Sequence, residues 1–219
     1  GNNLAGILLD DASTNGPGLV NIIHGNYIGT DVTGTGAIPN DVGVAVTNGS
    51  TKTVVGGNNA GEGNLISGNT SLGIDVVDPS TTGNFYMGNI IGLDVTGTTA
   101  LPNDIGISIS NGAIETIGGF GIYPNEGNLI SGNTTVGIDV GFDAGTGNQI
   151  QGNVIGLQGD GIGLVAGASG DGIWSAADFT TIGEPSGVII GGGNIISGNA
   201  NIGVNITGNF NDVVYNWIG

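Results

Sequence analysis

The sequence predicts an all-β fold, a single-stranded, right-handed parallel β-helix of about seven turns, each of about 32 residues with three short strands. Two repeats and one absence support this prediction. Asn-Leu-Ile-Ser-Gly-Asn occurs at 64–69 and 128–133 and returns as Asn-Ile-Ile-Ser-Gly-Asn at 194–199, so the offsets are 64 and 66 residues. The shorter motif Asn-x-Ile-Gly at 26–29, 89–92, 153–156 and 216–219 divides each interval in two. No stretch shows the 3.6-residue period of an amphipathic helix.

Three types of short apolar segment, bounded by Gly, Asn, Asp and Pro, recur in a fixed order and are interpreted as the three strands of a turn. The first type begins at Asn21, Thr53, Asn84, Glu115, Asn148, Thr180 and Asn211. The second begins at the seven Asn residues named in the next paragraph. The third begins at Gly6, Gly43, Gly73, Gly106, Gly137, Gly172 and Gly203. We expect like strands to stack in parallel at about 4.8 Å per turn, within one elongated domain over residues 1–219.

An Asn stands at the head of the second strand type in every turn. Asn tolerates left-handed backbone, and its amide can hydrogen-bond to the identical amide one turn away. We therefore expect a corner ladder of side-chain amides formed by Asn26, Asn64, Asn89, Asn128, Asn153, Asn194 and Asn216. This structural interpretation is preferred to a ligand-binding role for these residues.

Two positions after each of these Asn residues stands an Ile, which predicts an interior ladder. Its members are Ile28, Ile66, Ile91, Ile130, Ile155, Ile196 and Ile218. The position between Asn and Ile is also apolar, from Tyr27 to Trp217, although alternation lets only one of two successive strand residues face the interior. The sequence leaves open which one does. The outward residues must be covered by loops or by a partner, since an uncovered apolar stripe marks an interaction surface.

Insertions are confined to two corners, which alternate from turn to turn. One kind follows the second strand type, at 30–41, 93–104 and 157–171. The other kind joins the first strand type to the second in the intervening turns, at 56–63, 118–127 and 183–193. Such loops often form the binding face of a solenoid.

Composition restricts the partners and the location of the chain. One Lys, no Arg and 18 acidic residues give a net charge of −17 at pH 7. Cationic side chains to neutralise phosphate are missing, so we expect neither nucleic acid nor membrane insertion, and no apolar run approaches 18 residues. The near-absence of Lys and Arg leaves trypsin-like proteases little to cut. With the bias to Asn, Thr and Gly, this favours an extracellular or cell-surface location.

The alternation of Asn-x-Ile-Gly-Thr-Asp-x-Thr-Gly-Thr with Ile-Gly-Gly and Gly-Asn-x-Ile-Ser-Gly-Asn resembles the right-handed parallel β-helix repeats of large secreted bacterial and archaeal surface proteins, within the pectin-lyase-like superfamily. The resemblance runs from about Gly6 to Gly219. It implies the fold and no particular activity, because the superfamily includes polysaccharide lyases, hydrolases, phage tailspikes and adhesins. Its pectate lyases are expected to use carboxylate-bound Ca²⁺ with an Arg base, and this sequence has no Arg to carry over.

Asp75 and Asp139 are the weak catalytic candidates. They occupy the outward position of Gly-Ile-Asp-Val in alternate turns, so we expect them on one face about 10 Å apart, with Ser108 between them. That separation slightly exceeds the range of an inverting glycosidase pair. A solvated acidic face is the preferred interpretation of the two residues.

Ca²⁺ is the one cofactor that the sequence suggests. Asp31 and Asp94 begin Asp-Val-Thr-Gly-Thr loops, and Asp41 and Asp104 stand at the far ends of the same loops. Their carboxylates, with loop hydroxyls and carbonyls, are the hard oxygen ligands that Ca²⁺ accepts. The alternative is that Asp and Thr only close Asx-type turns.

The two ends of the chain lack polar caps. The first strand, with Leu4, Ile7 and Leu9, is of the third type, and the last, with Tyr215, Trp217 and Ile218 nearby, is of the second type, which a third-type strand should follow. Complementary open ends favour head-to-tail contact between copies, or with adjoining turns of a longer chain. We therefore expect a non-catalytic extracellular structural module that forms a filament or part of a stalk or adhesin. A polysaccharide-binding or polysaccharide-degrading β-helix protein is the alternative.

Overall fold

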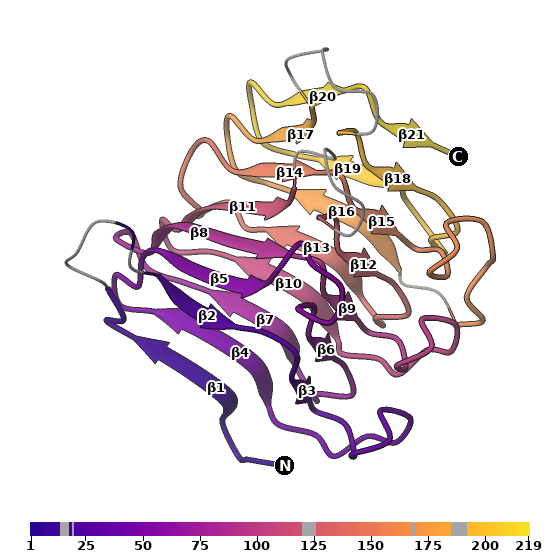
Figure 1. The fold of residues 1–219 in the computed structure, drawn as a ribbon. Helices are drawn as coiled ribbons and strands as arrows, with labels where there is room; N and C mark the ends of the chain where they lie inside the picture. The colour runs from indigo at the N-terminus through magenta and orange to yellow at the C-terminus, as the bar shows by residue number, and fades with distance from the viewer. Residues whose placement is uncertain (14–17, 19, 120–125, 168–169, 185–191) are drawn as a thin grey trace.

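The chain folds as a parallel β-helix of seven turns, as the repeats predict (Figure 1). The computed structural model describes residues 1–13, 18, 20–119, 126–167, 170–184 and 192–219. Three parallel sheets of seven strands each run along the length of the molecule. The fold class is thereby confirmed.

Each sheet collects one of the three strand types. Sheet A contains β1 (Ala5–Asp10), β4 (Val42–Thr47), β7 (Leu72–Val76), β10 (Ile105–Ile109), β13 (Val136–Val140), β16 (Asp171–Ser175) and β19 (Val204–Ile206). Sheet B contains β2 (Asn21–Ile23), β5 (Thr53–Gly56), β8 (Thr82–Met87), β11 (Ile114–Gly118), β14 (Gln149–Gln151), β17 (Thr181–Gly183) and β20 (Asp212–Val214). Sheet C contains β3 (Tyr27–Ile28), β6 (Leu65–Ile66), β9 (Ile90–Ile91), β12 (Leu129–Ile130), β15 (Val154–Ile155), β18 (Ile195–Ile196) and β21 (Trp217–Ile218).

We number the turns 1 to 7, so that turn 1 contains β2 and β3 and turn 7 contains β20 and β21. The turns are of two alternating kinds. Turns 1, 3 and 5 have a short corner between sheets B and C, made by Gly25, Gly88 and Gly152, all with φ 69°. After their sheet C strands come the outer loops 30–37, 93–100 and 157–164, each closed by an antiparallel bridge. Turns 2, 4 and 6 instead carry an inserted corner between sheets B and C. The inserted corners of turns 4 and 6 lie partly outside the described residues.

The register of sheet C decides which apolar position faces the interior. Ile28 pairs with Ile66, and the same position pairs through every strand to Ile218. These Ile side chains are buried in turns 1 to 6, whereas the preceding residue points outward and ranges from buried Leu65 to exposed Trp217. The Ile ladder is therefore the interior ladder.

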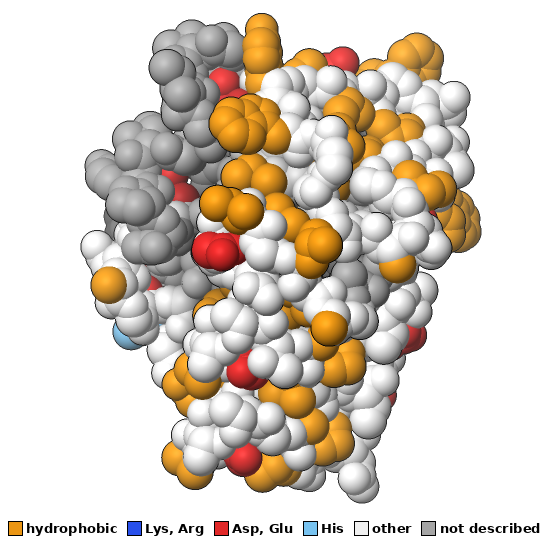
Figure 2. All heavy atoms as spheres, turned by 90° about the vertical axis from the view of Figure 1, so that its right-hand side faces the viewer, with side chains coloured by type: hydrophobic (Ala, Val, Ile, Leu, Met, Phe, Trp, Pro, Cys, Tyr) orange, Lys and Arg blue, Asp and Glu red, His pale blue; other side chains and the backbone are white. Residues whose placement is uncertain are grey.

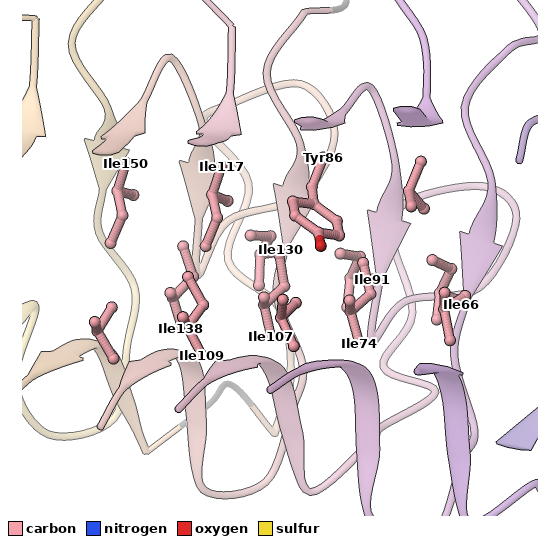
Figure 3. Packing of buried hydrophobic residues seen from close by; sticks show 14 of the residues in the cluster. Ile66, Ile74, Tyr86, Ile91, Ile107, Ile109, Ile117, Ile130, Ile138 and Ile150 are labelled. Carbon is pink, nitrogen blue, oxygen red and sulfur yellow. The ribbon is translucent and has the colours of Figure 1, made fainter. Parts of the chain in front are cut away.

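Inward side chains from the three sheets form one continuous core (Figure 3). Almost all are aliphatic, and each contributes roughly 1.5–3 kcal/mol by leaving water. Tyr86 of β8 and Ser175 of β16 are exceptions, and the hydroxyl of each is buried without a hydrogen-bond partner among the described residues. The core is one residue layer deep from each sheet, so its stability depends on unbroken stacking from turn to turn.

The two ends of the core differ. In turn 7 and β19 the inward residues are open to solvent: Ile206 is 37% exposed, Val213 41% and Ile218 53%. At the other end, Leu9 and Ile28 are buried, and Ala12 packs against the same core cluster. Leu9, expected near an open junction, thus points into the core. Leu4 is exposed and Ile7 partly buried.

Candidate functional site

The Asn residues at the corner between sheets B and C form an unbroken amide ladder. Each Asn Nδ2 donates to the Oδ1 of the Asn one turn on, at 2.8 to 3.0 Å from Asn26 through Asn216. The backbone N–H of the same donor reaches the same Oδ1, for example from Asn64 to Asn89 at 3.1 Å. From Asn64 to Asn216, each Oδ1 accepts and each Nδ2 donates within the protein, so these groups are engaged in structural bonds.

Two further ladders were not expected from the sequence. The first follows the corner between sheets C and A, where Nδ2 donates to Oδ1 along Asn2, Asn40, Asn69, Asn103 and Asn133. The sequence gives only a weak indication of this ladder, because Asn40 and Asn103 follow Pro whereas Asn69 and Asn133 follow Gly. Only the fold makes these positions equivalent.

The second lies at the start of the sheet B strands and contains a carboxyl group. Asn84 donates from its Nδ2 and its N–H to the two oxygens of Glu115, both at 2.8 Å, and Glu115 N–H donates to Asn148 Oδ1 at 2.8 Å. Glu115 is 2% exposed. Burial raises the pKa of Glu115 to about 7, although the bonds from Asn84 act in the opposite direction.

Asp75 and Asp139 lie in one outward row of sheet A. The register pairs Asp75 with Ser108, Ser108 with Asp139, and Asp139 with Trp174, which is 42% exposed. Burial raises the pKa of both carboxyl groups, with a further contribution from the charge of Asp78 on Asp75 and of Asp143 on Asp139. Asp139 Oδ1 is buried and accepts no hydrogen bond from any described residue. Asp75 and Asp139 are therefore two partly desolvated acids within this row.

The acidic residues of the outer loops are engaged by their own loops. Asp31 Oδ1 accepts bonds from Thr33 N–H at 2.9 Å and Thr33 Oγ1 at 2.6 Å, which lower the pKa of Asp31, the Oγ1 bond most. Asp94 Oδ1 is bonded in the same way by Thr96 Oγ1 at 2.7 Å.

At the far ends of these loops, Asp41 accepts a bond from Thr70 Oγ1 at 3.3 Å, and Asp104 accepts bonds from the hydroxyls of Thr134 and Thr135. In the described part of the chain, no three His, Cys, Asp or Glu side chains group together as a metal site would require. The geometry is that of Asx-type turns, and it leaves Ca²⁺ binding untested.

A groove of about 880 Å³ runs over the outer face of sheet C, across five turns from Tyr27 to Val154. Outer loops border it on one side and the inserted corner 57–63 on the other. Its lining combines glycine and Asn residues with Ala60, Val95 and the outward residues Tyr27, Leu65, Ile90, Leu129 and Val154, and none of the described lining residues is charged. Figure 2 shows this side of the molecule, where hydrophobic side chains form a broken column along the rod.

Comparisons with known proteins return no match. No family model matches the chain, and neither a curated protein nor a solved structure shows significant similarity. The described residues also contain no helix long and apolar enough to cross a membrane.

Three features remain that could act on another molecule. They are the acidic row of sheet A, the uncharged groove of sheet C and the open last turn. The row pairs two acids through Ser108, and the described lining of the groove has no Asp, Glu, Lys, Arg or His. The last turn exposes core side chains together with strand edges, which is a surface suited to another β-helix turn.

Proposed function

We propose that this chain is a non-catalytic structural module of an extracellular or cell-surface rod, and that its last turn receives a further β-helix turn. The observation that supports this proposal is the exposure of Ile206, Val213 and Ile218, whose equivalents in the inner turns are almost fully buried. Covering each would contribute roughly 1 kcal/mol. The free edges of β19, β20 and β21 would at the same time gain backbone hydrogen-bond partners.

The strand order of the three sheets specifies which strands can dock on the last turn. The strands β19, β20 and β21 belong to sheets A, B and C, and the next turn must add one strand to each in the same order. The strands β1, β2 and β3 are such a set. A second copy and adjoining turns of a longer chain both supply it, and either gives a longer rod without changing the fold.

The proposed location rests on composition and on likeness. A net charge of −17 with a single Lys suits a surface exposed to proteases and salt. The repeat motif resembles the β-helices of secreted bacterial and archaeal surface proteins of the pectin-lyase-like superfamily, and we include that relationship in the proposal.

Static light scattering and negative-stain electron microscopy of the 219-residue chain across concentration test the proposal. We expect rods whose length grows with concentration, and more so in 0.5 M NaCl than in 0.05 M, because copies carrying −17 each repel less when screened. Ile218→Asp should keep the particles short. Phe142→Asp, at an exposed site on the side of the rod, should leave assembly unchanged. A particle that stays monomeric at every concentration and salt would overturn the proposal.

The groove of sheet C favours a second function, binding of an uncharged linear polysaccharide. On a chain with 18 acidic residues, the lining of this groove has none, so an uncharged polymer meets no repulsion there. Affinity electrophoresis in gels containing neutral or anionic polysaccharides tests it. Gly61→Asp should abolish retardation by the neutral polymer, whereas Gly83→Asp, a glycine with similar open space outside the groove, should not. Equal retardation of both variants and the parent chain would refute this function.

A further inference from the structure

One corner between sheets A and B contains an Asp-Pro bond in a strained conformation. Asp78 follows β7, and its φ is 87°. A residue other than glycine rarely adopts a positive φ, and the residue before a proline is further restricted to extended backbone. Asp78-Pro79 is also the one Asp-Pro sequence of the chain. Residues held in such conformations cluster at functional sites, so this bond is a candidate for chemistry.

The neighbouring turns form the same corner with residues that suit it. Two positions after the aligned residues of sheet A, turns 2, 3 and 4 have Asn48, Asp78 and Asn111, all with positive φ. Asn tolerates this backbone, and glycine follows it in both neighbours, as Gly49 and Gly112. Among the described residues with positive φ, Asp78 alone precedes a proline. Breaking the Asp78–Pro79 bond would remove the restriction that the proline ring imposes.

Both neighbouring turns hold the carboxyl group of Asp78 in one orientation. Asn48 N–H donates to Asp78 Oδ2 at 2.9 Å, and Asn111 Nδ2 donates to Asp78 Oδ1 at 2.9 Å. A carboxyl oxygen of an Asp residue can close a ring on the carbonyl carbon of the same residue. Holding the carboxyl group in place before the reaction removes part of the entropic cost of that step.

A backbone donor polarises the carbonyl group of the same bond. Thr81 N–H donates to Asp78 O at 3.0 Å and closes a turn through Pro79 and Ser80. A donor aimed at a carbonyl oxygen stabilises the negative charge that develops there when a nucleophile attacks the carbon. Thr81 is itself fixed, because it is buried and its Oγ1 accepts a bond from Gly49 N–H at 3.1 Å. Nucleophile, carbonyl group and donor therefore lie together in one corner.

We propose that the folded chain cleaves its own Asp78–Pro79 bond. A carboxyl oxygen of Asp78 attacks the carbonyl carbon, so that a C–O bond forms as the C–N bond breaks. The nitrogen of Pro79 leaves as a secondary amine and takes a proton from solvent, to which Pro79 is exposed. Water then opens the cyclic anhydride of Asp78. The products are a chain that ends at Asp78 and a chain that begins at Pro79.

The cleaved chain should keep its fold. The first fragment contains β1 to β7, and the second contains β8 to β21. The two fragments stay paired in every sheet, through β7 with β10, β5 with β8 and β6 with β9. The cut would therefore separate the fragments only when the sheets unfold. This inference depends neither on end-to-end assembly nor on polysaccharide binding.

Denaturing gel electrophoresis and mass spectrometry of the purified chain, incubated at pH 5, test the proposal. The reference is the same chain in enough urea to unfold it, which keeps the Asp-Pro sequence and loses the corner. We expect the folded chain to be cleaved about tenfold faster, a change of about 1.4 kcal/mol in the barrier. In water enriched in ¹⁸O, opening of the anhydride places label in the side-chain carboxyl group of Asp78 as well as in the new terminal one. Direct hydrolysis labels only the terminal one.

Substitutions separate this reaction from general lability of the chain. Asp78→Asn removes the carboxyl nucleophile, and Pro79→Ala removes the restriction on Asp78, so each should slow cleavage about tenfold. The control Asp11→Asn changes an exposed Asp with φ 52° that precedes Ala12, and it should be cleaved like the parent chain. Circular dichroism verifies that each variant is folded.

Three results would overturn the proposal. They are equal rates for the folded and the unfolded parent chain, label confined to the terminal carboxyl group, and a folded Asp78→Asn variant that is cleaved as fast as the parent. The first two need no variant, so they decide the matter even if a substitution disturbs the corner.

Discussion

Glu115 makes the stability of the β-helix depend on pH. Its carboxyl group is buried in an amide ladder, and its pKa is raised from an ordinary 4.5 to about 7. Between these pH values the folded chain holds a proton that the unfolded chain releases, so the free energy of unfolding falls as pH rises. A difference of 2.5 pKa units at about 1.4 kcal/mol each gives a loss of about 3 kcal/mol between pH 4.5 and pH 7. The contribution is fully present below pH 4.5.

Glu115→Gln should remove this dependence. The amide can still accept a bond from Asn84, carries no charge, and avoids the desolvation of a carboxylate. We expect the variant to match the parent near pH 4 and to exceed it by up to about 3 kcal/mol at pH 8. Urea unfolding followed by far-ultraviolet circular dichroism, at pH 4, 5, 6, 7 and 8, measures the difference.

The matched control is Asp11→Asn, which removes a carboxylate at an exposed site where Asn tolerates the positive φ of 52°. Its effect should be small at every pH. If the difference between Glu115→Gln and the parent stays constant across the series to within about 0.5 kcal/mol, the carboxyl group does not titrate in this interval and the reasoning fails.

Two other substitutions or treatments test the ladders and loops. Asn89→Ala should lower the free energy of unfolding by about 3 kcal/mol, because it removes the Oδ1 that accepts both the N–H and the Nδ2 of buried Asn64 and the Nδ2 that donates to Val55 O. Asn26→Ala, at the end of the ladder, should cost about half as much in the same urea assay. Because Asp31 and Asp94 already accept bonds from loop hydroxyls and amides, we expect an unchanged melting curve in EDTA; a fall of several degrees that added Ca²⁺ restores would instead establish a metal site in these loops.

The predictability of the fold follows from the regular spacing of identical residues. The Asn26 ladder and the Ile28 ladder could be predicted because every turn repeats Asn at the corner and Ile two positions later. Which of the apolar residues in sheet C face the interior could not be predicted, because two successive residues of each strand are apolar. The outer loops cover one of them, and loop packing leaves no periodic signal.

The missed features share a physical cause. Asn40 and Asn69 bond as directly as Asn64 and Asn89, yet Asn40 follows Pro and Asn69 follows Gly, so no shared motif marks the two positions as equivalent. Glu115 replaces an amide in a ladder, so it reads as an ordinary strand residue until its burial is known. The groove depends on how loops from separate turns come together, and each loop alone carries no sign of it.

Asp75 and Asp139, the outward acids of sheet A, are either part of a structural row or the acids of an active site, and substitution distinguishes the two. The register places two strand spacings, about 10 Å, between Asp75 and Asp139, with Ser108 between them. Burial raises the pKa of both, so ionisation destabilises the fold as pH rises through those values. Asp139→Asn should therefore raise the melting temperature at pH 8 and leave it nearly unchanged at pH 3.

The same variants test for catalysis. A glycosidase built on these two acids would lose nearly all reducing-sugar release in both Asp75→Asn and Asp139→Asn, whereas Ser108→Ala would keep it. The rod that we propose should release no reducing sugar before or after substitution. The only measurable effect of its two acids should be a melting temperature that depends on pH. A parent chain that cleaves a polysaccharide, and two Asn variants that do not, would contradict the structural interpretation, because burial alone would then have prepared a proton donor.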